Sequence, residues 1–433
     1  MNIITLGQSE RNVLPRSLDR VEVPVAALTP METLGEPAPQ GVGSASAPLV
    51  LPLQIVDQDG SEFDNSPSLL GNIQDCLHPE SDPENEVGFY LSVRRELLFN
   101  LQAIAAELFN SRRLYSCLRI PLNTHGGVEL RVSSSGSVYV HGLIRCGLLW
   151  VCPCCGSKIS ELRKLELERG VKSWLDGGHK VAMATYTLRH DASMPLERVL
   201  QALQAAQDHF TAGALYSQLK ARYGVSGLVR ALEVTCGANG WHVHLHELLL
   251  LFDEVNYSSM ESEMLQRWYS ALRGVGFDCN EHGLRVTSGD QAAAMFQARY
   301  MSKYSRLPSG QWSIAQELAK AVSKRGHNGS YTPLELLIAA YEGDELAGAL
   351  YVEYGQAFAG KKHLRFSKGT RALLGLGGEA TDDQLANAAG GGELLGIVSA
   401  PEWSKKVAGL YDRRIELLHA VIAGDHQAFL SKI

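Results

Sequence analysis

The sequence lacks three features that would each have narrowed its function. It contains no run of about 18 consecutive apolar residues, so no membrane-spanning helix is expected. Its N-terminus lacks the basic start and apolar stretch of a secretory signal, and we expect a cytoplasmic protein. The phosphate-binding motif GxxxxGK(S/T) is also missing, so the sequence gives no sign of an ATP- or GTP-driven motor of that type.

An excess of positive charge is missing as well, since the formal net charge is −7. The acidity is confined to the start of the chain, because residues 1–90 hold 14 Asp and Glu against 3 Arg, a net of −11. Residues 91–433 therefore carry 37 Lys and Arg against 33 Asp and Glu, a net of +4. The overall charge thus does not argue against a body that binds nucleic acid.

Four regions are expected along the chain. Residues 1–86 are rich in Pro, Ser, Gly, Asp and Glu without a sustained period, which predicts an acidic, largely disordered leader. A self-inhibiting acidic arm is the alternative for this leader. A helix followed by a cysteine-rich module is expected over 87–176, a second domain over 177–307, and a helical region over 308–433. Within the cysteine-rich module a hairpin is expected, with strands 128–132 and 138–140 on either side of the turn-rich segment 133–136.

The second domain has a readable order of elements. Apolar alternation and helical periodicity predict strand, helix, two strands, helix, strand and a final helix. This order is typical of an α+β fold with a ferredoxin-like split βαβ arrangement, in which helices cover one face of a central antiparallel sheet. The expected elements are 180–188, 195–223, 228–235, 241–252, 257–273, 284–287 and 291–304.

Three histidines alternate along one expected strand, in the stretch WHVHLHELLLL. Because strand side chains alternate between faces, His242, His244 and His246 point the same way. Imidazoles at alternate positions are typical of a divalent metal site, and Glu233 on the preceding strand can add a carboxylate, which also suits Mg²⁺ or Mn²⁺. A histidine ladder without metal is the alternative.

Two tyrosines are spaced for one helix face. Tyr300 and Tyr304 are four residues apart, so both phenols can reach a single reaction centre, and Lys303 can contact phosphate or stabilise a phenolate. A tyrosine has a pKa of about 10 and needs a metal or a cation to act as a nucleophile. Packing of both rings in the core is the alternative.

A cysteine cluster predicts a structural zinc site. Cys152 and Cys155 form a C-x2-C pair, Cys146 lies six residues before it, and Cys117 is the best fourth ligand. Alternatives stay open, because His141 can replace Cys117, and Cys154 can replace Cys155. Buried free cysteines without metal are the remaining interpretation.

Together these motifs resemble the HUH superfamily of single-strand DNA endonucleases. GWHVHLH at 240–246 is similar to the GWHPHLH form of plasmid rolling-circle replication initiators, and 180–190 is similar to their first motif. Tyr300–Tyr304 resembles the YxxKY motif of the two-tyrosine members. The segments 113–117, 145–163 and 351–376 resemble the cysteine module and the C-terminal segment of these initiators.

The resemblance implies an HUH endonuclease fold over 177–307 and a nicking and joining enzyme. Tyr304 would attack a single-stranded or hairpin origin of a plasmid or phage with Mg²⁺ or Mn²⁺, leaving a 5′-phosphotyrosine and a 3′-OH primer for a host polymerase. A host helicase would open the duplex, and Tyr300 would act in a second transfer. A rolling-circle transposase, a non-catalytic zinc-dependent DNA-binding regulator and an unrelated metallohydrolase are the alternatives.

Overall fold

The computed structural model describes residues 83–123, 126–132, 138–288, 330–388, 390–409 and 412–425, and the isolated positions 428 and 431. The chain divides into two compact units, Met1–Gln54 and Ile55–Ile433, and the described residues all belong to the second. The leader predicted over 1–86 lies outside the described residues except for its last four positions.

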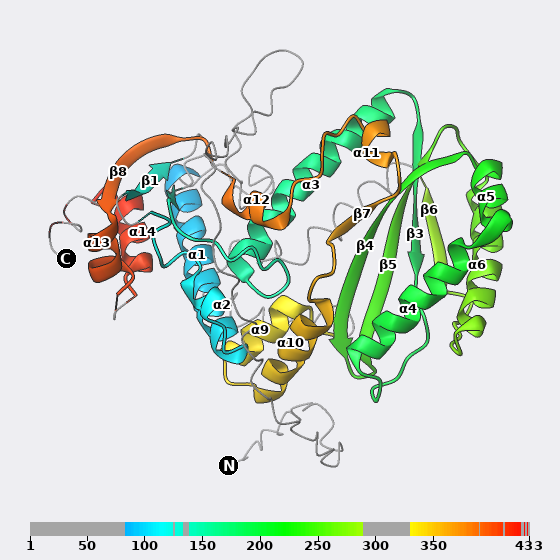
Figure 1. Ribbon diagram of the computed structural model, residues 1–433, viewed down its shortest axis with the longest axis horizontal. Helices are drawn as coiled ribbons and strands as arrows, with labels where there is room; N and C mark the ends of the chain where they lie inside the picture. Colours follow the sequence, from blue (N-terminus) through cyan, green and yellow to red (C-terminus); the bar gives the residue numbers. More distant parts are fainter. Residues whose placement is uncertain are drawn as a thin grey trace, which may run out of the picture. The chain divides into compact units, whose positions relative to one another are not determined.

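The main sheet has five antiparallel strands in the order β6-β3-β5-β4-β7 (Figure 1). Its strands are β3 (Lys180–Tyr186), β4 (Val225–Gly237), β5 (Gly240–Leu251), β6 (Leu284–Ser288) and β7 (Leu364–Phe366). The first and third of the four predicted strands are central, which is the order that a split βαβ arrangement requires. The predicted α+β class with an antiparallel sheet is confirmed.

Three helices cover one face of this sheet: α4 (Leu196–Thr211), α5 (Gly213–Arg222) and α6 (Tyr257–Gly274) (Figure 1). Tyr186 of β3 packs edge-to-face on Phe210 of α4 and Trp268 of α6, with ring centroids 5.3 and 5.1 Å apart. The single helix predicted over 195–223 is wrong. Ala212 is extended and Gly213 has a φ of +76°, which ends α4 and lets α5 leave in a new direction.

The opposite face of the sheet is covered only in part. The second half of α3 (Pro153–Asp176) places Leu167, Val171 and Trp174 in one buried cluster with Leu248 and Leu250 of β5. The three predicted metal-binding histidines lie on this same face, farther along β5 toward its hairpin with β4. On this face β5 therefore has an apolar end, which packs against α3, and a polar end with the histidines, which lies nearer the β4–β5 hairpin.

The region before the main sheet forms a second, three-stranded sheet in the order β2-β1-β8. The predicted hairpin is confirmed, with β1 (Gly127–Val132) paired to β2 (Val138–His141). The third strand is β8 (Glu393–Ser399), which comes from near the C-terminus and pairs with the outer edge of β1. Two helices precede this sheet, α1 (Pro83–Leu108) and α2 (Arg112–Ser116).

The C-terminal helix α14 (Arg414–Ile422) packs against α1. Arg414 is 2% exposed and its guanidinium lies over the Phe99 ring, 4.2 Å from the centroid. Asp412 forms ion pairs with Arg414 at 2.7 Å and with Arg119 at 2.5 Å. This carboxylate therefore forms ion pairs with two largely buried cations where the two ends of the described chain meet.

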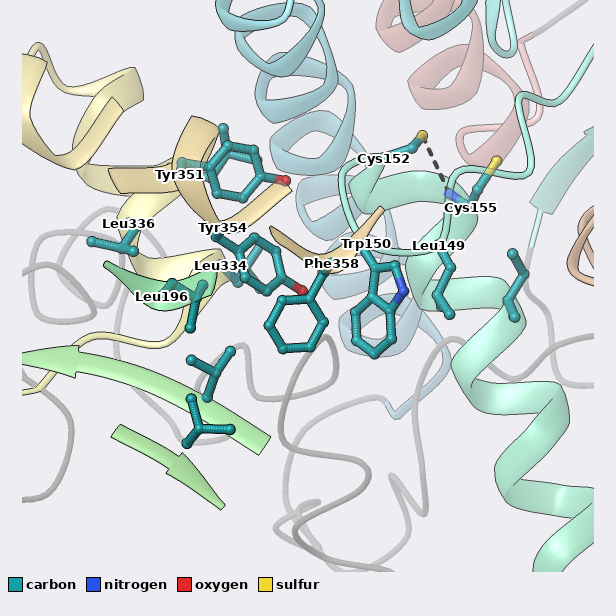
Figure 2. Packing of buried hydrophobic residues seen from close by; sticks show 14 of the residues in the cluster. Leu149, Trp150, Cys152, Cys155, Leu196, Leu334, Leu336, Tyr351, Tyr354 and Phe358 are labelled. Carbon is teal, nitrogen blue, oxygen red and sulfur yellow. Dashed lines mark hydrogen bonds between the residues drawn. The ribbon is translucent and has the colours of Figure 1, made fainter. Parts of the chain in front are cut away.

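A helical hairpin, α9 (Pro333–Tyr341) and α10 (Glu345–Phe358), packs between α1 on one side and α4 and β4 on the other. Tyr354 and Phe358 pack on Trp150 beside the N-terminus of α3 (Figure 2). Glu353 of α10 accepts hydrogen bonds from the Leu196 backbone at 2.7 Å and the Trp241 indole at 3.0 Å, and so fixes the start of α4 to β5.

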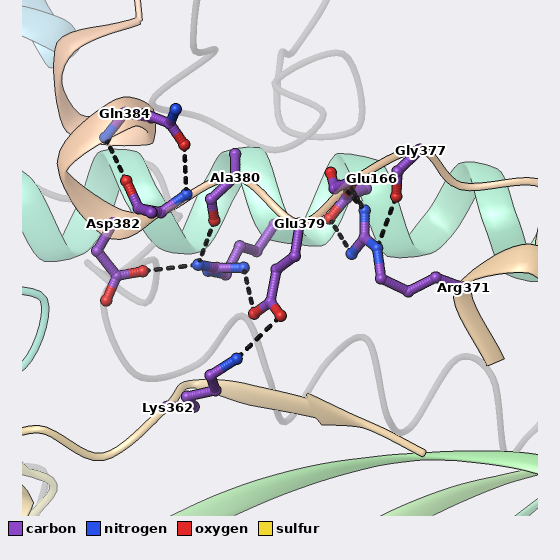
Figure 3. A network of polar contacts seen from close by, with 11 residues as sticks. Glu166, Lys362, Arg371, Gly377, Glu379, Ala380, Asp382 and Gln384 are labelled. Atoms are coloured by element: carbon purple, nitrogen blue, oxygen red, sulfur yellow. Dashed lines mark hydrogen bonds and ion pairs between the residues drawn. The ribbon is translucent and has the colours of Figure 1, made fainter. Parts of the chain in front are cut away.

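The stretch after β7 runs along α3 and is held by charge pairs (Figure 3). Arg371 binds Glu166, and Arg163 contacts Asp382 at 2.7 Å. The short elements of this part are α11 (Thr370–Leu373), α12 (Asp382–Asn387), α13 (Ala400–Glu402) and the π-helix η2 (Trp403–Val407). Over the described part of the chain, no helix combines the length and the apolar character that crossing a bilayer demands.

Candidate functional site

The polar end of the sheet face is built by the β4–β5 hairpin. The register places Glu233 opposite His244 and Thr235 opposite His242, while Thr185 of β3 lies opposite His246. Residues paired in this way point to the same face. The predicted strand alternation therefore holds, and the structure brings the three histidines and Glu233 to one side of the sheet.

His246 is the most closely held of these residues. Its Nε2 lies 2.7 Å from a carboxylate oxygen of Glu233, and its Nδ1 lies 3.0 Å from the hydroxyl of Thr185. The residue is only 3% exposed. The His244 ring stacks on it, with centroids 6.1 Å apart and planes 15° apart. Two imidazoles and one carboxylate, all side chains of types that bind divalent metals, thus occupy neighbouring positions on one face of the sheet.

His242 has a different neighbour. Its Nδ1 lies 3.1 Å from Nε2 of His190, a residue at the end of the loop that follows β3, and the two rings meet edge-to-face. Burial lowers the pKa of both imidazoles, and the nearby His190 lowers that of His242 further. The sequence pattern does not predict a role for His190, because one histidine after a strand carries no periodic signal.

Gly240 explains why the His190 loop can approach the hairpin. It has a φ of +82°, and a Cβ added there would lie 2.9 Å from the Cα of Ala192 and 3.0 Å from the Asp191 carbonyl oxygen. A side chain at this position would therefore push the loop away.

Glu247 lies on the opposite face of the sheet from the histidines and points toward the covering helices. This fully buried carboxylate accepts hydrogen bonds from the Tyr186 hydroxyl at 2.6 Å and from Gln207 at 2.8 Å, and it pairs with Arg230. Burial, together with the Glu247 charge, raises the pKa of Tyr186 well above its usual range. The network fixes β5 in register beside β3 and β4.

The predicted catalytic residues Tyr300, Lys303 and Tyr304 lie outside the described residues. The positions on either side of that segment are anchored on the sheet. Ser288 ends β6 opposite Ala182, and Tyr331 exchanges two backbone hydrogen bonds with Cys236, of 2.8 and 2.7 Å. Ser330 lies beside Gly237 in the hairpin that carries His242.

The second candidate site is a cluster of four buried cysteines, Cys117, Cys146, Cys152 and Cys155, whose ligand atoms all lie within 4.8 Å of one another. The sulfur of Cys155 lies 3.5 Å from that of Cys117 and 3.7 Å from that of Cys146, and Cys117 lies 3.8 Å from Cys152. A tetrahedral Zn site with bonds of about 2.3 Å has sulfurs about 3.8 Å apart. These distances are too long for disulfides, and the four-cysteine group can hold a metal ion such as zinc.

The N-terminus of α3 shapes this cluster. Cys152 is the N-cap, Pro153 follows at the first helical position, and the Cys152 sulfur accepts a hydrogen bond from the Cys155 backbone N–H at 3.5 Å (Figure 2). Hydrogen bonds from the thiols of Cys117, Cys146 and Cys152 hold the pKa of Cys155 well below its usual value.

Cys154 and His141, the two alternative ligands, have other partners than the four sulfurs. Cys154 points away from the four sulfurs, and its thiol donates to the Leu98 carbonyl at 3.5 Å. His141 lies 3.5 Å from a Glu129 carboxylate oxygen on the neighbouring strand. The geometry thus selects Cys155 and Cys117 over these two residues.

Comparison with known proteins finds no family model and no solved structure that matches this chain. Similar curated proteins include one named "Protein rep" from Streptomyces lividans, 26% identical over 340 residues, covering 64% of this chain and 75% of that protein. Another is named "Neomycin resistance protein", from Streptomyces cyanogenus, and is 28% identical over 155 residues, covering 30% of this chain and 36% of that protein. The chain is thus similar over most of its length to a protein named as a Rep protein.

Proposed function

We propose that this chain is a plasmid replication initiator that nicks single-stranded origin DNA through a tyrosine. The observation that carries the proposal is the set of His244, His246 and Glu233 on one face of an antiparallel sheet. Similarity to the Streptomyces lividans protein named "Protein rep" supports a role in replication. The nicking chemistry follows from the donor set and from the YxxKY motif.

His244, His246 and Glu233 would hold a Mg²⁺ or Mn²⁺ ion, with Glu233 a better third ligand than His242, whose ring is engaged with His190. Bound there, the ion would polarise the target phosphate and offset developing negative charge. The Thr185 hydroxyl contacts Nδ1 of His246 and so orients the ring with Nε2 toward the site.

In this proposal Tyr304 is the nucleophile. Its phenolic oxygen forms a bond to the phosphorus as the bond to the 3′ oxygen breaks, and the proton of the phenol is released while the departing oxygen takes one up. The products are a 5′-phosphotyrosine and a free 3′-OH that a host polymerase can extend, after a host helicase has opened the duplex. Tyr300 would carry out the second transfer, and Lys303 would stabilise the phenolate.

The four-cysteine group would have a structural role. Its ligands Cys152 and Cys155 lie at the start of α3, and the far half of the same helix covers the apolar end of the histidine face. A zinc ion in the cluster would therefore fix the helix that borders the proposed active site.

The test is incubation of the full chain with a labelled single-stranded origin oligonucleotide and Mn²⁺. We expect a labelled protein band that survives denaturation and is lost in the Tyr300→Phe/Tyr304→Phe variant. Tyr341→Phe is the matched control, because Tyr341 is 46% exposed on α9. Cleavage without a covalent adduct would instead indicate a metallohydrolase, and binding without cleavage a DNA-binding regulator. An active double variant would exclude these tyrosines.

A further inference from the structure

A basic groove lies at the β4–β7 edge of the main sheet, between these strands and α5, and encloses about 600 Å³. Five of its lining residues are cations: Lys220, Arg230, Lys362, Arg365 and Lys368. None of its lining residues is acidic. The groove lies on the helix-covered side of the sheet, because Arg230 contacts Glu247, and is therefore separate from the histidine face.

Two of the five cations are already neutralised. Arg230 pairs with the buried Glu247, and Lys362 lies 3.0 Å from a carboxylate oxygen of Glu379. For Lys220, Arg365 and Lys368, the described part of the chain supplies no carboxylate within 4.0 Å. The groove therefore presents about three uncompensated positive charges to a ligand.

The strand register also brings two of these cations close together. Arg365 of β7 lies directly opposite Arg230 of β4, on the same face of the sheet. Like charges at directly opposite positions destabilise a strand pair. Lysines on an edge strand can also discourage unwanted strand addition. That role does not account for Lys220 on α5, whereas an anionic ligand accounts for all three cations for which the described residues supply no carboxylate partner.

The aromatic rings of the groove have cations packed on their faces. Lys220 and Arg267 lie over Tyr216, 5.4 and 5.9 Å from its centroid, and Arg371 lies over Phe366 at 4.9 Å. Proteins that bind single strands stack bases on open aromatic faces. The groove therefore offers charge without a stacking platform, which suits a phosphate backbone better than unpaired bases.

We infer that this groove binds the phosphate backbone of duplex DNA, independently of sequence, beside the segment that is nicked. The identity of the ligand as DNA rests on the proposed function. The charge and position of the groove do not depend on it. In this arrangement Arg365 and Lys368 contact consecutive phosphates of a stem or flanking duplex, while the opposite sheet face receives the single strand.

The test measures binding of a labelled duplex of about 20 base pairs, of arbitrary sequence, between roughly 50 and 200 mM salt. The protein carries Tyr300→Phe/Tyr304→Phe, so the result does not depend on nicking. In this background Arg365→Ala/Lys368→Ala should weaken duplex binding roughly tenfold or more near 0.1 M salt and reduce the logarithmic salt slope by about 1.8. Lys172→Ala/Lys405→Ala removes two exposed charges elsewhere and should leave both unchanged.

The charge-retaining variant Arg365→Lys/Lys368→Arg should keep the parental slope, which separates loss of charge from loss of structure. Unchanged thermal unfolding of the alanine variant provides a second check. An alanine variant with the parental affinity and slope would overturn the inference. So would a loss confined to a single-stranded oligonucleotide of the same length.

Discussion

Nε2 of His246 and a carboxylate oxygen of Glu233 lie 2.7 Å apart, although the strand register places Glu233 opposite His244. The hydrogen bond therefore runs diagonally from β5 to β4. The Glu233 carboxylate thus lies opposite His244 in the strand register and is bonded to His246. On the far side of the His246 ring, the Thr185 hydroxyl lies 3.0 Å from Nδ1. The ring is thus held from both nitrogens, and each contact has its own testable consequence.

Thr185→Val should weaken binding of Mn²⁺ at the histidine face. Valine keeps the shape but removes the hydroxyl that orients His246, and loss of such a supporting contact typically lowers metal affinity about 10- to 100-fold. Calorimetric titration of the zinc-loaded protein with Mn²⁺ measures this directly. Thr235→Val, on the same sheet face opposite His242, is the control and should bind as the parent does. Equal Mn²⁺ affinities for the parent and both variants would show that Thr185 does not support the metal site.

Cys117→Ser should abolish zinc binding at the cysteine cluster. A structural zinc site needs its full tetrahedral ligand set, and metal binding there also contributes folding free energy. We expect the zinc content to fall from about one ion per chain to near zero, with a lower melting temperature. Cys154→Ser is the matched control, because Cys154 is also buried but lies outside the four-sulfur group. Loss of zinc in the control as well would contradict the assignment of ligands.

Gly240→Ala should cost more stability than Gly276→Ala. Both glycines have a φ near +80°, but an added Cβ at Gly240 meets the Ala192 backbone at 2.9 Å, whereas at Gly276 it meets nothing within 4 Å. The strain of a positive φ, about 1 kcal/mol, is common to both variants. Chemical denaturation should therefore show a larger loss of unfolding free energy for Gly240→Ala. Similar losses for both variants would mean that the His190 loop can shift away at little cost.

Asp412→Asn should destabilise the protein more at neutral pH than in acid. Burial alone would raise the pKa of the Asp412 carboxyl, but its hydrogen bonds with Arg414 and the charges of Arg414 and Arg119 hold it below the usual 3.8. The ionised group thus contributes stability above about pH 4, and this contribution is lost as the pH falls through the folded-state pKa. Removing it leaves two largely buried arginines without this carboxylate, at a cost of about 3 kcal/mol.

Denaturant unfolding between pH 7 and 3 measures this effect, and the difference between the two proteins should shrink as the pH falls. Asp383→Asn is the control, because its ion pair with Arg113 is exposed on both sides and should contribute less than about 1 kcal/mol. A constant difference between parent and Asp412→Asn down to pH 3 would contradict the role of the ionised carboxylate.

Local patterns in the sequence predicted the elements that their own residues determine. Alternation over 241–252 predicted β5 and the common face of its three histidines, and the turn-rich segment after Val132 predicted the β1–β2 hairpin. The C-x2-C pair with Cys117 and Cys146 predicted the four residues that meet at the start of α3. In each case the spacing along the chain fixes which side chains share a face or a turn.

Elements that depend on distant partners were missed. β7 has three residues, and β8 carries no clear alternation, so each is a strand only because β4 or β1 offers it an edge. The pairing of His190 with His242 depends on the close approach of a loop at Gly240, which no local pattern encodes. The split of the long helix at Ala212 is not predictable from the local pattern, because a single glycine inside an amphipathic stretch also occurs within helices.

The pairing of β8 with β1 has a consequence for how the protein is made. β1 ends at Val132 and β8 begins at Glu393, so a ribosome completes the whole main sheet before it delivers the third strand of the smaller one. Until then β1 has an open edge that can pair with another nascent chain. Synthesis that stops before Glu393 would leave this edge exposed, and such fragments are expected to aggregate or be degraded even though the histidine strand has already been translated.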